Sequence, residues 1–140
     1  MFSTTLFKSY LNTKIIANKI FYYSSTLSTN NVVWDIIKNE SKEGIVVIAN
    51  NQTKGRGRGE KKWISKKNMD ILCSFSMKQK FDISKMGLHA LAIPIGIING
   101  IKYFTDIPIK VKWPNDIYAK DKKIGGILIE TKKIKNTIFF

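Results

Sequence analysis

Apolar residues in the first third of the chain alternate between strand-like and helix-like spacings. Residues 20–23 form a short run of isoleucine and aromatic side chains, which predicts a strand. A helical spacing follows at four apolar positions: Val32, Val33, Ile36 and Ile37. Ser28 or Thr29 is expected to be the N-cap of this helix, which should end near Asn39. The β-branched residues 45–49 predict a buried strand.

The middle of the chain contains a long polar segment between two predicted strands. Residues 50–68 show no periodicity, so they are expected to form a functional loop. Residues 71–77 alternate apolar with smaller or polar side chains and predict a strand. Residues 87–104 are apolar over the length of a helix, and four positions are expected to share one apolar face: Leu88, Leu91, Ile95 and Ile98. Residues 109–113 predict a strand that Pro114 ends.

The last 24 residues contain a hairpin signature and a second apolar run. Residues 117–119 and 123–130 flank the turn sequence Lys120-Asp121-Lys122. Residues 132–135 are expected to be a solvated turn, and residues 138–140 to begin another strand. The predicted order is strand, helix, strand, strand, helix, strand and hairpin. It favours a single α+β (α/β two-layer) domain, in which a mixed sheet packs against helices.

Both ends of the chain differ from its middle. Residues 1–34 contain no Asp or Glu, and residues 1–18 are expected to be a leader or a disordered extension of a domain at 19–140. If residues 1–18 act as a transit segment, the protein belongs in a plastid or mitochondrion, and otherwise in the cytoplasm. Because the chain stops within an apolar run, we expect the domain to be incomplete at its C-terminus.

The composition of the chain excludes several classes of site and chemistry. The single Cys73 rules out an internal disulfide framework and Cys-cluster zinc sites, and the single His89 rules out Ser-His-Asp and multi-histidine chemistry. No apolar run approaches the roughly 20 residues of a membrane-spanning helix, so no membrane span is expected.

The formal net charge of +14 invites a nucleic-acid interpretation, because basic side chains neutralise phosphates. However, of the 24 basic residues only Arg56 and Arg58 are arginines, and both lie in one loop. We attribute most of the charge to a lysine-rich composition. The two retained arginines are expected to serve bidentate recognition of a carboxylate or phosphate.

A glycine–arginine repeat follows the predicted strand 45–49: Gln52-Thr53-Lys54-Gly55-Arg56-Gly57-Arg58-Gly59. Alternating glycines allow the backbone to approach a ligand closely, and alternating arginines add hydrogen-bond donors. The spacing matches neither a Walker A loop nor a Rossmann fingerprint. Taken alone, the loop is equally compatible with weak nucleic-acid binding.

A second polar cluster ends the predicted strand at 109–113: Lys112-Trp113-Pro114-Asn115-Asp116. It is either a turn with a packing tryptophan or the mouth of a site. Lys123-Ile124-Gly125-Gly126 opens the next strand, where a glycine pair indicates close approach by a ligand or another backbone.

These pieces resemble, in order and spacing, the catalytic domain of biotin–protein ligases. That fold is shared with lipoate ligases and is similar to class II aminoacyl-tRNA synthetases. Four blocks between residues 20 and 130 carry the resemblance: residues 28–30, 52–63, 112–116 and 123–128. The resemblance implies activation of biotin with ATP to biotinyl-5′-adenylate, and transfer of biotin to one lysine of the biotin carboxyl-carrier domain of a carboxylase.

The resemblance also implies which residues bind biotin. Three lie beside the biotin pocket: Ser28, Thr29 and Asn30. Gln52 and the Arg56 amide would bind the ureido ring. Four residues belong to the loop that contacts biotin and the adenylate and closes over them: Gly55, Arg56, Gly57 and Arg58. Trp63 would help to fold this loop over the ligand.

Three residues are implied as catalytic: Lys123, Arg58 and Asp116. Cations at the first two positions would lower the barrier when a carboxylate attacks the α-phosphate, because two anions meet there. Asp116 would orient or deprotonate the acceptor lysine. Mg²⁺ is expected to arrive with ATP, and Asp116 is the one protein side chain considered as its ligand.

The remaining residues of the same blocks are implied to line the substrates. Asn115 would lie near phosphate and Mg²⁺, and Lys112 would contact substrate. Gly125 and Gly126 would leave room for biotin.

The chain departs from the family pattern in three ways. Gly59 and Glu60 stand where the family carries another basic residue and a glycine. No helix-turn-helix fits before residue 20, so DNA binding is not expected. The resemblance also implies that the family's pattern continues past residue 140, so further segments are expected there. Three alternatives stay open: a lipoate or octanoate ligase, a truncated non-catalytic remnant, and a basic nucleic-acid-binding domain. A homodimer through the sheet edge is also considered.

Overall fold

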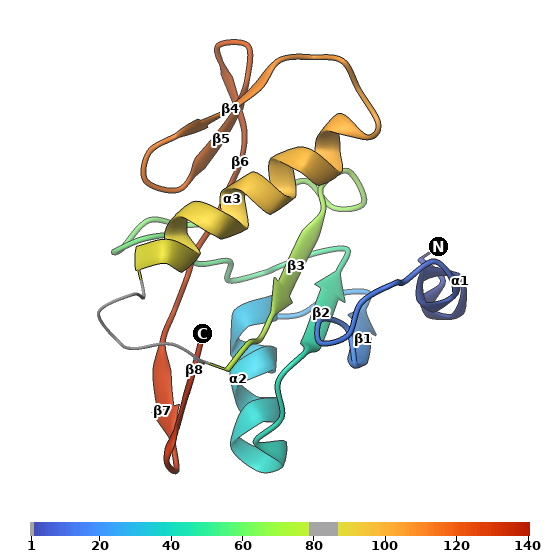
Figure 1. Cartoon of the computed structure of the whole chain (residues 1–140), viewed down its shortest axis with the longest axis vertical. Coiled ribbons are helices and arrows are strands. Elements are labelled where there is room, and N and C mark those ends of the chain that lie inside the picture. Colours follow the sequence, from blue (N-terminus) through green and yellow to red (C-terminus); the bar gives the residue numbers. More distant parts are fainter. Residues whose placement is uncertain (1, 79–86) are drawn as a thin grey trace. The chain divides into compact units, whose positions relative to one another are not determined.

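The computed structural model describes residues 2–78 and 87–140, and the chain divides into two compact units (Figure 1). The first unit is Met1–Lys78 with Thr131–Phe140, and the second is Gln79–Glu130. Described elements of the first unit are α1 (Thr4–Ser9), β1 (Lys19–Tyr23), α2 (Thr29–Glu40), β2 (Ile45–Ala49), β3 (Leu72–Phe75), β7 (Lys132–Ile134) and β8 (Thr137–Phe139). Those of the second unit are α3 (Gly87–Lys102), β4 (Ile109–Lys112), β5 (Asp116–Ala119) and β6 (Lys122–Gly126).

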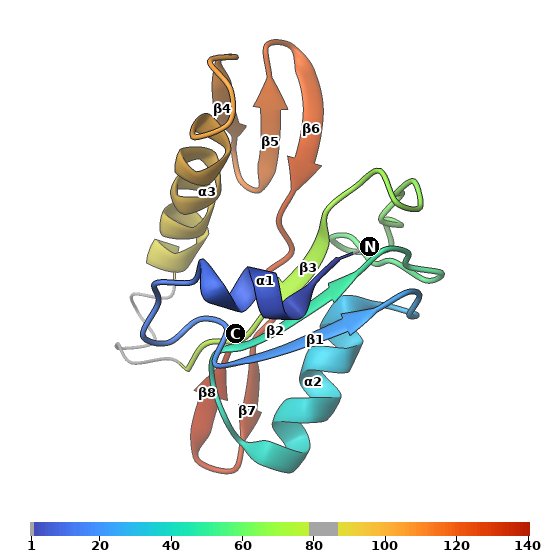
Figure 2. The ribbon, with the colours of Figure 1, turned by 90° about the vertical axis from the view of Figure 1, so that its right-hand side faces the viewer.

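The first unit is built around a mixed three-stranded sheet in which β2 is central. β1 pairs parallel with β2, and β3 pairs antiparallel with it. Because β2 has a neighbour on each side and α2 covers one face of the sheet, its β-branched run is almost entirely buried (Figure 2). The short α1 lies beside β1 on the side away from α2, and Phe2 stacks there on Tyr22. The predicted strands at 20–23 and 45–49 are confirmed.

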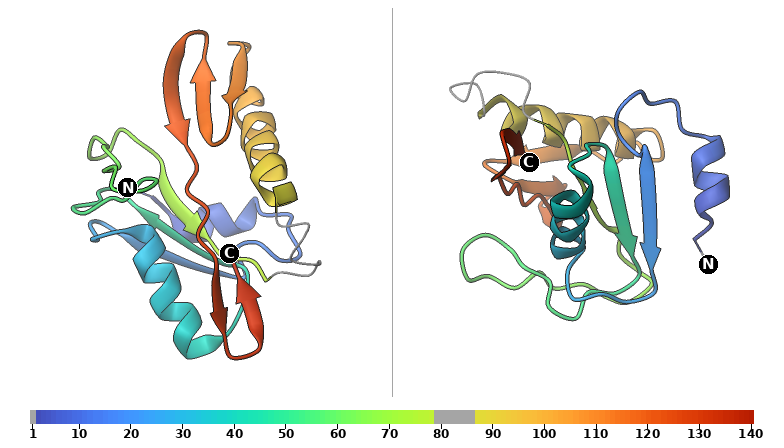
Figure 3. Two further views of the ribbon diagram at one scale, coloured as in Figure 1. Left: turned by 90° about the vertical axis from the view of Figure 1, so that its left-hand side faces the viewer. Right: turned by 90° about the horizontal axis from the view of Figure 1, so that it is seen from below.

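The core of the first unit lies between α2 and β2. Five buried residues of these elements form it: Val33, Trp34, Ile37, Ile45 and Val47. Phe139 of β8 joins them with no exposed surface. The β7–β8 hairpin runs alongside α2 (Figure 3), and Phe140 exchanges backbone hydrogen bonds with Met77 at 2.8 and 3.0 Å. The C-terminal segment therefore closes the core of the first unit.

The interpretation of residues 132–135 as a solvated turn is wrong for most of that segment. Residues 132–134 form β7, which pairs antiparallel with β8, and the turn itself is at Lys135, where φ is 53°. Ile134 packs against the core, while Lys132 Nζ lies 4.8 Å above the Trp34 ring. Because three of the four residues at 132–135 are lysines, the segment resembled a solvated turn, although its side chains alternate between core and solvent.

Helix α2 begins as predicted and ends one residue later than predicted. Ser28 occupies the capping position with an extended backbone, yet its hydroxyl makes no capping hydrogen bond. After Glu40 the chain turns at Ser41, whose φ is 52° and whose N–H donates to Ile37 O at 2.8 Å. The start of this helix is thus free to be capped by another residue.

The second unit is an antiparallel sheet of order β4–β5–β6 with α3 against β4. The predicted hairpin is confirmed, with Lys120 in its turn at φ 52°. The predicted apolar face of α3 is wrong for three of its four residues: Leu88, Leu91 and Ile95 are 56%, 49% and 56% exposed. Ile98, the fourth residue of the predicted face, is buried, and so is Pro94. Because α3 is apolar nearly all round, spacing alone did not select the packed face.

The observed mixture of sheets and helices confirms the predicted α+β class. None of the helices within residues 2–78 and 87–140 is long and apolar enough to cross a membrane.

Candidate active site

A cluster of uncharged polar side chains lies where β1 and β2 end. Because these strands are parallel, the segments that follow them meet at the same edge of the sheet, and Thr26 forms a bridge with Gln52 there. Gln52 Oε1 accepts hydrogen bonds from Thr29 N at 2.7 Å and from Thr29 Oγ1 at 3.0 Å. The first free N–H of α2 is therefore satisfied by Gln52 rather than by the Ser28 hydroxyl.

Ser74 on β3 extends this cluster. Its Oγ lies 2.7 Å from Thr29 Oγ1 and also donates to Asn30 Oδ1. Sequence reasoning missed Ser74, although a serine between apolar neighbours on a predicted strand was a signal. That signal does not discriminate by itself, because Ser76 on the same strand side is buried and its Oγ accepts from Ile45 N at 3.2 Å. Ser74 therefore belongs to the polar cluster, whereas Ser76 hydrogen-bonds the backbone of the central strand β2.

The loop of residues 52–63, called the arginine loop below, folds back on itself. Trp63 N donates to Gly55 O at 3.0 Å, and Gly57 N donates to Lys61 O at 2.7 Å. A Cβ added at Gly55 would lie 2.8 Å from Trp63 O, and one at Gly57 would lie 3.1 Å from Lys61 O. The two glycines therefore allow other backbone segments of the same loop to lie close to them.

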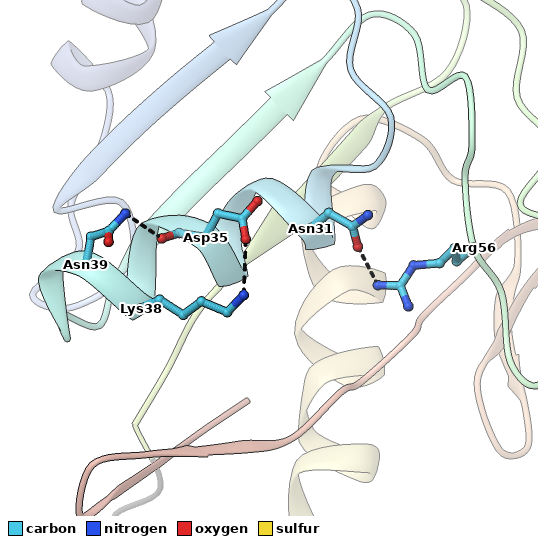
Figure 4. A network of polar contacts seen from close by, with 5 residues as sticks. All are labelled: Asn31, Asp35, Lys38, Asn39 and Arg56. Carbon is cyan, nitrogen blue, oxygen red and sulfur yellow. Dashed lines mark hydrogen bonds and ion pairs between the residues drawn. The ribbon is translucent and has the colours of Figure 1, made fainter.

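The two arginines of this loop have different surroundings. Arg56 Nη2 donates to Asn31 Oδ1 on the first turn of α2 at 2.8 Å (Figure 4). Arg58 lies at the tip of the loop and is exposed. Gly59 follows it with φ 64°, a backbone conformation that glycine adopts without strain. Trp63 is half-buried where the loop closes.

A charged cluster lies on one face of the second unit. Lys123 Nζ is 2.6 Å from Asp116 Oδ1, and their side chains are 52% and 28% exposed. Asp116 is opposite Lys112 on β4, and Lys123 is opposite Tyr118 beyond a register shift in the β5–β6 pairing. Lys112 Nζ lies 5.2 Å above the Tyr118 ring. Cross-strand register thus brings two of the three implied catalytic residues together.

Asn115 and the glycines of β6 shape the edge of this cluster. Asn115 Nδ2 donates to Ile127 O at 3.0 Å, and Ile127 N donates to Asn115 O at 2.8 Å. Asn115 therefore holds the chain that leaves β6. Among the residues that the structure describes, an added Cβ at Gly125 would meet nothing closer than Ile117 Cβ at 3.9 Å, which leaves room at this position. Gly126 pairs in register with Asp116.

The implied site residues fall into two groups, each within one unit. The first unit contains Ser28, Thr29, Asn30, Gln52, Gly55, Arg56, Gly57, Arg58 and Trp63. The second unit contains Lys112, Asn115, Asp116, Lys123, Gly125 and Gly126.

The family follows from comparison with known sequences. A sequence profile described as the biotin/lipoate A/B protein ligase family matches residues 22–139. The chain belongs to this family. The resemblance carried by the four sequence blocks is thereby confirmed.

Individual relatives agree with the family. The chain is 30% identical over 120 residues to the bifunctional ligase/repressor BirA of Bacillus subtilis, covering 86% of the chain and 37% of the relative. It is 29% identical to human biotin–protein ligase over an alignment of 150 positions, gaps included, which covers 99% of the chain and 20% of the relative. The chain thus spans well under half the length of these two relatives.

A solved structure supports the fold. The biotin protein ligase from Aquifex aeolicus, in complex with biotin and ATP, is similar with a TM-score of 0.69 and 27% identity. The match covers 87% of this chain and 50% of that one. The fold is that of biotin protein ligases, similar to class II aminoacyl-tRNA synthetases, as the sequence predicted.

Proposed function

We propose that this chain carries biotin- and ATP-binding parts of a biotin–protein ligase. The whole protein would convert biotin and ATP to biotinyl-5′-adenylate and pyrophosphate. A lysine amine of the biotin carboxyl-carrier domain of a carboxylase would then attack the adenylate, forming an amide bond to biotin and releasing AMP. The proposal concerns the whole protein because the chain spans 37% of the Bacillus relative and 50% of the Aquifex structure.

The observation that carries this proposal is the uncharged cluster around Gln52. Its members offer hydroxyl and amide groups but no formal charge: Thr29, Asn30, Gln52 and Ser74. The ureido ring of biotin is also uncharged and has both N–H donors and a carbonyl acceptor. A site built to hydrogen-bond such a group rejects an analogue that lacks it. Lipoate has no ureido group, so the cluster favours biotin.

The charged cluster suits the adenylation step. Attack of the biotin carboxylate on the α-phosphate brings two anions together, and Lys123, which is paired with Asp116 in the structure, would supply a cation. In the proposed sequence Lys123 leaves Asp116 for the reacting groups, and Arg58 adds a second cation. Asp116 is then available to accept a proton from the acceptor lysine.

The charged cluster around Lys123 and Asp116 suits Mg²⁺ only when the ion arrives bound to ATP. Within the described part of the chain, no group of three or more His, Cys, Asp or Glu side chains is placed to hold a metal. Mg²⁺ commonly uses one or two carboxylates together with substrate phosphates, and Asp116 is suited to that role. When bound with ATP, the ion would neutralise charge on the leaving pyrophosphate.

The test is a calorimetric titration of biotin into the chain, alone and with ATP–Mg²⁺. We expect saturable biotin binding that ATP strengthens. Lipoate should not compete. Competition by lipoate would favour a lipoate ligase instead, and salt-sensitive RNA binding without biotin binding would favour a nucleic-acid-binding domain. Circular dichroism on the same sample separates an unfolded chain from a wrong proposal.

Four statements stay predictions: the leader at residues 1–18, the location in the cytoplasm or an organelle, the homodimer, and the absence of DNA binding.

A further inference from the structure

The arginine loop is fastened at its base to the segment that precedes α2. Thr53 N donates to Thr26 O at 2.9 Å, and Lys54 N donates to Leu27 O at 2.9 Å. These bonds continue the parallel relation of β1 and β2 beyond the ends of the strands. The base of the loop is therefore an extension of the sheet.

Beyond this base the loop forms an arm, residues 55–63, that is paired with itself. Its backbone hydrogen bonds join Trp63 to Gly55 and Gly57 to Lys61, and Arg56 forms a bridge with Lys62. This internal pairing consists of few hydrogen bonds, so a contact between the arm and α2 would both set the direction of the arm and oppose the opening of those bonds.

A side chain of α2 supplies that direction. Asn31 Oδ1, in the first turn of the helix, accepts from Arg56 Nη2 at 2.8 Å. Figure 4 also shows Asp35 with Lys38 and Asn39, whose drawn contacts stay within α2. Of the helix residues shown there, Asn31 is the one that reaches the loop.

We propose that Asn31 is a positioning residue that holds Arg56, and through it the arm, against α2 before any ligand binds. The relevance to biotin rests on the proposed function, whereas the ordering of the arm does not. An arm that is already ordered loses less conformational entropy when it closes on a ligand. In this proposal Asn31 acts through Arg56, whose Nη2 donates to its Oδ1.

Amide hydrogen exchange measured by NMR on the ligand-free chain tests this directly. Because the bond joins an exposed arginine to a neutral amide, Asn31→Ala is expected to speed exchange at the arm amides of Gly57 and Trp63 by about fivefold. The base amides of Thr53 and Lys54 should exchange at the native rate. A general loss of stability would speed both sets alike, and that result would overturn the proposal.

Two further variants sharpen the result. Asn31→Asp keeps the Oδ1 acceptor and adds a charge, so the arm should exchange as slowly as in the native chain. Asn39→Ala is the matched control on the same helix, and it should leave the arm unchanged. In an Arg56→Ala background, Asn31→Ala should add nothing. An additional increase there, or no response to Asn31→Ala in the native background, would overturn the proposal.

Biotin titration of the same samples separates the two proposals. If the native chain binds no biotin while Asn31→Ala still loosens the arm, the proposed function fails and the positioning role stands. If biotin binds but Asn31→Ala leaves exchange in the arm unchanged, the positioning role fails and the proposed function stands.

Discussion

The two candidate clusters are built from different chemistry. In the first unit, Thr29, Gln52 and Ser74 are uncharged and are joined by hydrogen bonds between distant parts of the sequence. In the second, Asp116 and Lys123 form an ion pair within one β-hairpin. Neutral groups discriminate between ligands by shape and hydrogen bonding, whereas opposite charges stabilise charge that develops during a reaction. The proposed function therefore places recognition at the first cluster and chemistry at the second, and both roles stay predictions.

The largest expected effect is at Lys123. Lys123→Gln should reduce biotin-dependent ATP–pyrophosphate exchange by about 10²–10³-fold, because a cation aimed at developing charge is removed. Biotin affinity without ATP should stay near native. Lys122→Gln, the preceding residue on β6, is the matched control and should change the rate little. Equal losses in both variants would show that general charge, not the position of Lys123, matters.

The next largest effect is expected at Gln52. Gln52→Ala removes the acceptor for Thr29 and the proposed ureido contact, so biotin affinity should fall by about 10–100-fold. The neighbouring Asn51→Ala, which breaks a contact with Ser25, serves as the control. Calorimetry measures both. If Gln52→Ala leaves biotin affinity unchanged but reduces the gain in affinity that ATP provides, the roles proposed for the two clusters would be wrong.

A smaller effect should separate two serines of the β3 segment. Ser74→Ala is expected to weaken biotin binding by about fivefold with little change in stability. Ser76→Ala leaves the buried Ile45 N–H without its side-chain acceptor, so it should lower the free energy of unfolding by about 1–3 kcal/mol. Calorimetric titration and urea unfolding of both variants measure the two responses. Identical behaviour would mean that Ser74 is only structural.

The smallest effect concerns ionic strength. The screening length falls from about 10 Å at 0.1 M salt to about 3 Å at 1 M. Biotin binding alone should change by less than about twofold, because the first cluster is uncharged. ATP-dependent strengthening should fall by more than biotin binding does. If salt weakens biotin binding alone just as much, the cations of the arginine loop contribute to recognition as well.

Sequence patterns predicted local features well. The helix after Ser28, the strand at 45–49 and the hairpin around Lys120 depend on neighbouring residues, and each is present. The Lys123–Asp116 pair follows from the same hairpin once its register is known. The contacts that the arginine-loop glycines make within the loop were not predicted. Their function as contact points within the loop depends on a fold-back that no periodicity signals.

Residue type and spacing were thus sufficient for most elements of this chain and for its family, although they missed strand β7. They also indicate residues suited to phosphate and carboxylate chemistry, and that assignment stays a prediction. They were not sufficient for the participation of Ser74, the packed face of α3 or the closure of the core by Phe139. Each of these depends on contacts between segments far apart in the chain. Such contacts depend on strand register and helix rotation, and a shift of one residue in β3 would turn Ser74 away from Thr29. Only the packing of complete elements selects one register over another.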